Sequence, residues 1–478
     1  MAAPKKSSRA PLARLSALAV WLLAAAVALT AGQAPRVEAV DLLVRGGAIV
    51  TMDARRRVIP NGFLAVRGER IVAVGDAAEA TRYRAKTILE AGGKAVLPGL
   101  INAHTHAPMT LFRGLADDLA LQAWLTRFIF PAEAKNVSRE MVRAGTRLAC
   151  LEMIRGGTTC FVDMYYFEGD IAEVTEAAGM RAILGQTVID FPVPDALTPQ
   201  LGLENAERLI QKYKVGHPLI TPAVAPHAPY TCAPETLAAC RALADKHGAP
   251  LVTHLAEADT ETRTILERYG QRPILHVERL GLLGPRTIAA HVVQIAADEY
   301  PILARRGVGI AHCPQSNMKL AAGVAPIPEM LAAGLAVGLG TDGAASNNDL
   351  DMFEEMDTAA KLHKVMRRDP TVLPAQAALE MATIGGARAI HMADRIGSLE
   401  VGKLADFIIV DVSSPHQLPN YNLYSTLVYA TKSGDVETVA VHGKLLMRDR
   451  RVLTLDEAAI RRETAAFRTR ILESLEAK

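Results

Sequence analysis

The sequence is poor in cysteine and contains no closely spaced cysteine pair. Its five cysteines are odd in number, lie in apolar or strand-like surroundings and include no Cys-x-x-Cys motif. A disulfide framework normally shows an even number of cysteines at short spacings. We therefore interpret them as structural thiols and give little weight to disulfides: Cys150, Cys160, Cys232, Cys240 and Cys313.

The chain also lacks an excess of charge of either sign. It carries 53 Lys and Arg against 51 Asp and Glu, and both signs are spread along its length. Proteins that bind nucleic acid or an acidic polymer concentrate positive charge in a patch. The composition therefore argues against nucleic acid as a partner and favours a small-molecule substrate.

Residues 1–34 differ in composition from the rest of the chain. A basic start precedes residues 15–31, an apolar run interrupted only by Ser16 and Thr30. The segment has no twin arginine, no cysteine for lipid attachment and no polar face that would make it a first helix of the fold. We predict a signal peptide cleaved near Ala34, or an uncleaved anchor as the protein's one membrane contact. The expected location is the periplasm, with the cytoplasm as the alternative.

The remaining length suits one large barrel with an appendage, or two to three smaller domains. Short β-like segments bounded by Gly and Pro occur near both ends of the chain, on either side of a long middle part. We predict a small β-sandwich domain built from residues 40–94 and 396–455, a barrel from residues 95–395, and a C-terminal helix over residues 456–478.

The middle part predicts a (β/α)8 TIM-like barrel, because apolar β-branched segments alternate there with amphipathic helical ones. In such barrels the chemistry lies at the C-terminal ends of the strands. The predicted strands are residues 95–106, 158–164, 181–189, 219–226, 250–254, 287–291, 307–312 and 335–342.

Histidines end several of these strands. His104 and His106 stand at i and i+2, so both side chains point to the same face of a strand and can form half of a zinc site. Taken alone, the pair could equally be two partly exposed surface histidines. Reading the other strand ends adds His254 and Asp342. Three imidazoles and one carboxylate, with one open position, are typical of a mononuclear catalytic zinc site.

Glu257 follows His254 by three residues and leaves the same strand end. A carboxylate beside an activated water can move protons between that water and a substrate nitrogen. The alternative is a surface glutamate that opens the next helix.

Together the strand-end motifs resemble the amidohydrolase superfamily. Within it, the resemblance is to the 5-methylthioadenosine/S-adenosylhomocysteine deaminases and the related triazine hydrolases and cytosine and guanine deaminases. It covers roughly residues 40–455. The motifs are PGLINAHTH (98–106), FVDMY (161–165), APHAPYT (225–231), THLAE (253–257), AAHV (289–292), HCPQSN (312–317) and GLGTDGAASN (338–347).

The resemblance implies the two-part architecture and hydrolytic removal of an amino group from an aromatic ring. It also implies one divalent metal, zinc with Fe²⁺ as the alternative, held by His104, His106, His254 and Asp342. Glu257 matches the proton-transferring acid, and His291 and Asp342 match the groups that act on the attacking water.

The resemblance also implies substrate contacts by Glu257, by His227 and by Glu133, which matches an acidic residue that holds ribose hydroxyls. After the third strand the related deaminases usually show arginines, whereas this chain has Gln186, which we take as a substrate contact. This departure weighs against recognition of an anionic or amino-acid tail. Binuclear amidohydrolases need a modified lysine where this chain has His227, so a single metal is expected.

The first hypothesis is a deaminase of an adenine-type nucleoside such as 5′-methylthioadenosine or S-adenosylhomocysteine. The alternative is a deaminase or dechlorinase of pterins, guanine-like bases or triazines, and Glu257 favours release of ammonia, which must be protonated to leave. A remote alternative is an inactive metal-holding binding protein. A homo-oligomer is possible.

Overall fold

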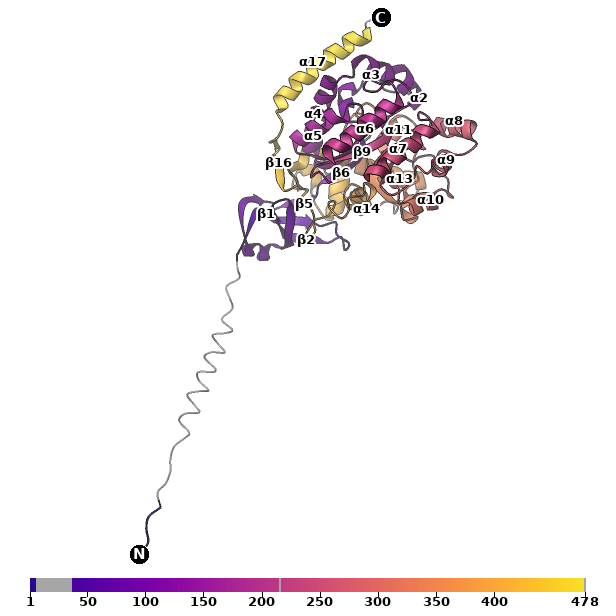
Figure 1. The fold of residues 1–478 in the computed structure, drawn as a ribbon. Coiled ribbons are helices and arrows are strands. Elements are labelled where there is room, and N and C mark those ends of the chain that lie inside the picture. The colour runs from indigo at the N-terminus through magenta and orange to yellow at the C-terminus, as the bar shows by residue number, and fades with distance from the viewer. Residues whose placement is uncertain (6–36, 215, 477–478) are drawn as a thin grey trace.

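The computed structural model describes residues 1–5, 37–214 and 216–476 (Figure 1). Most of the predicted leader, residues 1–34, lies outside these described residues. Within the described ranges, none of the helices has both the length and the apolar character needed to cross a membrane. The fold-class prediction is confirmed: a ring of parallel strands forms a barrel, and a separate sheet combines both ends of the chain.

The separate sheet has nine strands in one hydrogen-bonded array, ordered β17-β16-β15-β14-β5-β1-β2-β3, with β4 paired to β1. Antiparallel pairing of β14 with β5 joins the two ends of the chain. Its strands are β1 (Glu38–Val50), β2 (Val58–Arg67), β3 (Arg70–Asp76), β4 (Tyr83–Glu90), β5 (Lys94–Pro98), β14 (Phe407–Asp411), β15 (Val436–Val441), β16 (Lys444–Arg448) and β17 (Arg451–Val452).

The barrel strands pair in parallel in the order of the sequence. The last strand returns to the first, where the Asp342 N–H donates to the His104 carbonyl at 2.9 Å. The strands are β6 (Leu100–Thr105), β7 (Thr158–Tyr165), β8 (Arg181–Val188), β9 (Ile220–Pro226), β10 (Leu251–Leu255), β11 (Thr287–His291), β12 (Gly309–His312) and β13 (Ala336–Leu339).

Helices surround the barrel (Figure 1), so β7 and β8 are buried at every position, as expected for parallel strands covered on both faces. The helices are η2 (Ala107–Phe112), α2 (Leu121–Trp124), η3 (Leu125–Ile129), α3 (Phe130–Asn136), α4 (Arg139–Gly156), α5 (Glu168–Ala178), α6 (Pro199–Tyr213), α7 (Pro234–His247), α8 (Asp259–Tyr269), α9 (Pro273–Arg279), α10 (Tyr300–Arg306), α11 (Pro314–Lys319), α12 (Ile327–Ala332), α13 (Met352–Arg367), α14 (Ala375–Met381) and α15 (Ile384–Ala389).

Smaller helical segments connect strands of the nine-stranded sheet along the chain. They are η1 (Ala77–Arg82), η4 (Pro415–Gln417), α16 (Leu423–Ser425), η5 (Thr426–Ala430) and η6 (Ser433–Asp435). Of these, α16 packs against α14, and η5 packs against α13 and α14. The C-terminal helix, α17 (Glu457–Glu476), runs along the outside of the barrel over α4 and α3 (Figure 1). Glu463 of α17 pairs with Arg147 of α4 at 2.6 Å, and Ile471 of α17 is buried.

The predicted first barrel strand, residues 95–106, is two strands in the structure. β5 belongs to the nine-stranded sheet, and only β6 belongs to the barrel. Gly99 separates them, and a Cβ at this position would lie 2.1 Å from the Thr159 side-chain oxygen. The chain crosses between the sheets where only glycine permits this close approach. The barrel therefore begins at Leu100 rather than at residue 95.

Candidate metal centre and active-site pocket

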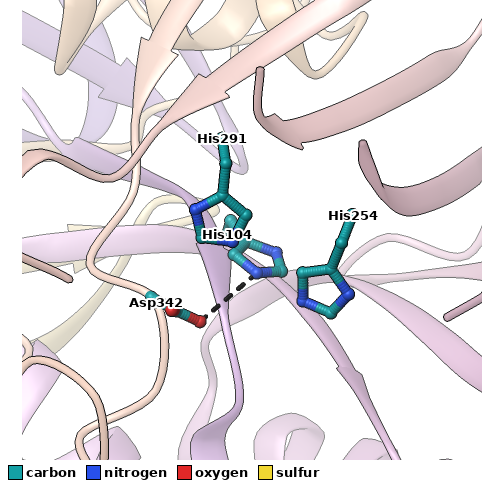
Figure 2. Close-up of side chains that lie close together, drawn as sticks. All are labelled: His104, His254, His291 and Asp342. Atoms are coloured by element: carbon teal, nitrogen blue, oxygen red, sulfur yellow. Dashed lines mark ion pairs between the residues drawn. The ribbon is translucent and has the colours of Figure 1, made fainter. Parts of the chain in front are cut away.

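A cluster of imidazoles and one carboxylate lies at the C-terminal ends of the barrel strands (Figure 2). The ligand atoms of His104, His254, His291 and Asp342 all lie within 4.8 Å of one another. His291 and Asp342 have left-handed backbones, with φ of 72° and 61°. This conformation is uncommon for residues other than glycine and concentrates at functional sites.

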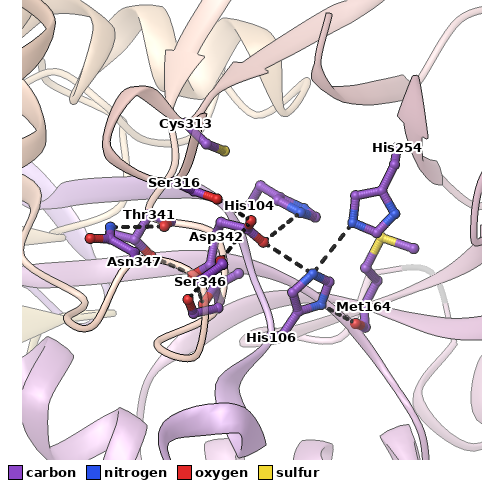
Figure 3. A network of polar contacts seen from close by, with 12 residues as sticks. His104, His106, Met164, His254, Cys313, Ser316, Thr341, Asp342, Ser346 and Asn347 are labelled. Atoms are coloured by element: carbon purple, nitrogen blue, oxygen red, sulfur yellow. Dashed lines mark hydrogen bonds and ion pairs between the residues drawn. The ribbon is translucent and has the colours of Figure 1, made fainter. Parts of the chain in front are cut away.

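Asp342 is the centre of the polar network in Figure 3. Its Oδ1 lies 3.4 Å from His104 Nε2 and 3.1 Å from His106 Nε2, while its Oδ2 accepts from Ser316 Oγ at 2.7 Å and Ser346 Oγ at 2.9 Å. Against burial, which favours the neutral acid, the neighbouring imidazoles hold the pKa of Asp342 well below its ordinary value. The carboxylate is therefore ionised and oriented.

Backbone carbonyls orient two of the rings. His106 Nδ1 lies 2.6 Å from the Met164 carbonyl, and His254 Nδ1 lies 2.8 Å from the His227 carbonyl. A carbonyl only accepts, so each Nδ1 carries a proton, and in the neutral ring each Nε2 keeps a lone pair. These two Nε2 atoms are 3.4 Å apart. Two lone pairs at this distance repel each other unless a cation or a proton lies between them.

The cluster fits a divalent metal. Among the described residues, neither ring nitrogen of His104 makes a hydrogen bond, and His291 Nε2 makes none, although all three atoms are buried. Buried polar atoms without partners are costly. Imidazole nitrogens and one carboxylate are the donors that zinc and similar metals take. A bound cation would give a partner to the lone pair of one His104 ring nitrogen.

His291 has surroundings different from those of the other rings. Its Nδ1 lies 3.0 Å from Nδ2 of the Asn317 side chain, and its Nε2 lies 3.8 Å from Glu257 Oε1. Because an amide NH₂ group donates, Nδ1 accepts and the ring proton is on Nε2. His291 thus directs an N–H toward the cluster and Glu257.

Glu257 follows β10 and is only 5% exposed. Burial, together with the charges of Asp342 and Glu261, raises the pKa of the Glu257 carboxyl well above its ordinary value. A carboxyl in this environment holds a proton more tightly than an exposed one, as a proton donor at neutral pH requires.

The cluster opens into a pocket with a mainly apolar and aromatic wall. Glu133 of α3 lies in this wall and accepts from the Tyr165 hydroxyl at 2.7 Å. Burial raises the pKa of Glu133 to about 7. The wall is formed by His106, Met109, Leu121, Trp124, Leu125, Ile129, Phe130, Glu133, Met164, Tyr165, Tyr166, Thr187, His227, Tyr230, His254, Glu257, His291, Leu320 and Asp342.

Gln186 is the predicted substrate contact that the structure does not bring to this pocket. Its Nε2 donates to Asp195 at 2.9 Å, and it lines a different pocket between α5 and α6. The physical reason is strand alternation: neighbouring residues of β8 face opposite sides, so Thr187 lines the barrel pocket and Gln186 does not.

Some residues of the site were not identified from the sequence. Ser316 and Ser346, which donate to Asp342, and Asn317, which contacts His291, lie just beyond the ends of β12 and β13. They lie inside the motifs HCPQSN and GLGTDGAASN, and their position just after strand ends is the sequence feature that could have identified them. Their contacts depend on chain folding beyond the strand.

Comparisons with known proteins agree with this geometry. A model described as the amidohydrolase family matches residues 95–446. A protein of Syntrophobacter fumaroxidans named 5-methylthioadenosine/S-adenosylhomocysteine deaminase is 52% identical, over 87% of this chain and 95% of its own. The crystal structure of an adenosine deaminase from Xanthomonas campestris with bound zinc is 41% identical with a TM-score of 0.90, covering 91% of this chain and 99% of that one. An atrazine chlorohydrolase from Arthrobacter aurescens complexed with zinc is 25% identical with a TM-score of 0.83, covering 89% and 100%.

Proposed function

This chain belongs to the amidohydrolase family and is a hydrolase of C–N bonds, and we propose that it releases ammonia from the adenine ring of a nucleoside. 5′-Methylthioadenosine and S-adenosylhomocysteine are the substrates that the names of its relatives indicate. The observation that carries the proposal is a single pocket shared by the histidine cluster, Glu257 and Glu133. An aminated ring and its ribose can therefore reach all three at once.

We assign one zinc ion to His104, His106, His254 and Asp342. His106 and His254 are supported as ligands by their Nδ1 contacts to carbonyls, which leave each Nε2 lone pair free. His104 is supported by its two buried nitrogens without hydrogen bonds. Zinc is the metal in the two solved structures named above, and Fe²⁺ is the alternative.

His291 is left as a catalytic group rather than a ligand. With its Nδ1 facing the Asn317 amide, its Nε2–H is a donor and has no lone pair for a metal. That N–H lies beside Asp342 and 3.8 Å from Glu257 Oε1. His291 can therefore orient an attacking water by hydrogen bonding and stabilise the negative charge that develops on its oxygen.

Glu257 carries the proton transfers. A bound divalent metal supplies Lewis acidity and lowers the pKa of water, which makes attack on the ring carbon possible at neutral pH. Glu257 gives a proton to the ring nitrogen as aromaticity is lost, takes up a proton from the attacking water, and passes this proton to the amino group. The remaining hydroxyl proton returns to Glu257 as the C–N bond breaks. Ammonia is a poor leaving group until it is protonated, so the transfer to the amino group permits C–N cleavage.

The pocket wall favours a nucleoside with a small neutral 5′ group. None of the described residues that line it is Lys or Arg, so the wall offers no counter-ion for the carboxylate of an amino-acid tail. Leu121, Trp124 and Leu125 instead present apolar surface. Glu133, held by Tyr165, supplies acceptors for ribose hydroxyls. 5′-Methylthioadenosine therefore fits better than S-adenosylhomocysteine.

The test is ammonia release by the zinc-loaded protein from 5′-methylthioadenosine, S-adenosylhomocysteine, adenosine, guanine and a pterin, with chloride release from atrazine measured in parallel. We expect the highest kcat/KM with 5′-methylthioadenosine. Turnover confined to guanine, pterin or atrazine would contradict the proposal and support the alternative. Zinc binding without any turnover would support an inactive binding protein.

We further propose that residues 1–34 direct export to the periplasm, on the basis of their basic start and apolar run. Fusion of this segment to a reporter that is active only outside the cytoplasm should give reporter activity. A silent but well-expressed fusion would contradict export.

A further inference from the structure

A second buried glutamate supports the chain around Glu257. Glu261, in the first turn of α8, is 2% exposed. Its Oε1 accepts the Ala256 N–H at 3.0 Å, and its Oε2 accepts the Glu257 N–H at 2.8 Å. Both carboxylate oxygens are thus occupied by the backbone that carries the proposed proton donor.

The segment that Glu261 holds has an unusual backbone. Ala256 is buried with a φ of 52°, a left-handed conformation that residues with a side chain adopt only at a cost. On the other side of this bend, the Ala256 carbonyl accepts the Gln294 N–H at 2.8 Å and the Leu255 carbonyl accepts the Val292 N–H at 3.1 Å. The bend is therefore fixed from both sides, and Glu261 provides the two bonds on the N–H side.

We propose that Glu261 is a positioning residue that holds the Glu257 carboxyl facing His291 and the pocket. The proposal rests on the proposed deaminase function, in which Glu257 transfers protons. Because a misplaced catalytic group loses rate steeply with distance, an anchor on the backbone of Glu257 acts directly on kcat.

The competing explanation is that Glu261 only stabilises the start of α8, where acidic side chains are favoured by the helix dipole. The two N–H groups that it accepts argue otherwise, because Ala256 and Glu257 precede the N-cap residue Ala258. Asp259 also places an acidic group in this first turn, in an exposed pair with Arg263. The specific contribution of Glu261 is therefore to the loop before the helix.

Glu261→Gln replaces one acceptor oxygen by an NH₂ group, so one of the two backbone N–H groups faces a donor. We expect kcat on the best substrate to fall on the order of 10- to 100-fold, with KM and zinc content within twofold of wild type. Glu267→Gln, an exposed position on the same helix, is the matched control and should leave all three unchanged. Unchanged kcat in Glu261→Gln would overturn the proposal.

If the Gln variant does not fold, Glu261→Asp keeps both oxygens on a shorter side chain and should show the same selective loss of kcat.

A double-variant comparison separates positioning from general damage. On a Glu257→Gln background, Glu261→Gln should change the residual rate less than threefold, because the group that it positions is already lost. An equal loss on both backgrounds would show that Glu261 acts on the fold or the metal, and would overturn the proposal.

Hydrogen exchange of the zinc-loaded protein tests the contact without any substrate. In Glu261→Gln, the amides of Ala256 and Glu257 should exchange faster, while those of the helix interior keep their protection. Should the wild type deaminate no compound of the panel, the proposed function fails, yet this measurement still reports on the anchor. Unchanged protection of both amides would refute it.

Discussion

The two ends of the barrel bury charged groups in opposite ways. At the N-terminal end, Arg181 at the start of β8 and Asp406 just before β14 are 1% and 2% exposed. Arg181 Nε and Nη2 donate to the two Asp406 oxygens at 2.7 and 3.1 Å, Arg181 Nη1 donates to the Pro218 carbonyl at 2.5 Å, and the His442 N–H donates to Asp406 at 2.7 Å. These buried groups are thus paired within the protein.

At the C-terminal end the polar groups are incompletely paired. Both ring nitrogens of His104 and Nε2 of His291 make no hydrogen bond within the described chain. The difference teaches that burial alone does not mark a functional site. Paired charges at the N-terminal end, the closed end, link the barrel to the small sheet. At the C-terminal end, the open end, imidazole lone pairs without a hydrogen-bond partner are available to a ligand. Substitutions at the two ends should therefore affect different properties.

The largest effect is expected for His254→Ala at the open end. Removing one proposed ligand should abolish both zinc binding and ammonia release, because the remaining donors no longer complete a four-ligand site. Metal analysis and an activity assay of the purified variant provide the measurement. His416→Ala, an exposed histidine of the small domain, is the control and should keep both. A fully active His254→Ala protein would contradict the assignment of metal binding to the open end.

Glu257→Gln should lower turnover by at least about 10²-fold, the range typical of positioned acid-base groups. Gln keeps the size and hydrogen bonding of Glu but cannot transfer a proton. Zinc content and substrate binding, measured by metal analysis and by calorimetry with the slowly turned-over variant, should stay close to wild type. A rate near that of the wild type would contradict proton transfer by Glu257 and would support the alternative of a glutamate that only opens the next helix.

Arg181→Met at the closed end should lower the free energy of unfolding by about 3 to 5 kcal/mol, because it leaves Asp406 as an unpaired buried charge. Urea unfolding at a fixed zinc concentration measures this loss, and kcat per folded molecule should not change. Adding Asp406→Leu should restore most of the stability. Arg67→Met, which breaks an exposed pair with Glu38, should cost less than about 1 kcal/mol. A selective fall of kcat in Arg181→Met would contradict the comparison.

The smallest effect concerns pH at the pocket wall. Burial raises the pKa of Glu133 from about 4.5 to about 7, so the folded state binds this proton more tightly than the unfolded state. The stability contribution of Glu133 is full below pH 4.5 and is lost as pH rises through 7. Relative to wild type, Glu133→Gln should therefore gain stability between pH 5 and pH 8, by about 1 to 3 kcal/mol since one pKa unit is about 1.4 kcal/mol. An equal difference in unfolding free energy between Glu133→Gln and wild type at pH 5 and pH 8 would contradict this prediction.

The sequence by itself determined the fold class, because alternating apolar strands and amphipathic helices have few architectures that bury both faces of a parallel sheet. It also placed His104, His106, His254, Asp342 and Glu257 at strand ends, where a barrel brings them together.

Tertiary structure decided what depends on contacts between distant segments. The close approach of Gly99 to Thr159 divides residues 95–106 between two sheets, and strand alternation turns Gln186 away from the pocket while Thr187 enters it. The ring protons of His106 and His254 are placed by carbonyls of Met164 and His227, and the Glu257 loop is held by Glu261. Local sequence specifies which donors and acceptors exist, whereas their pairing is fixed only when packing sets distances of about 3 Å.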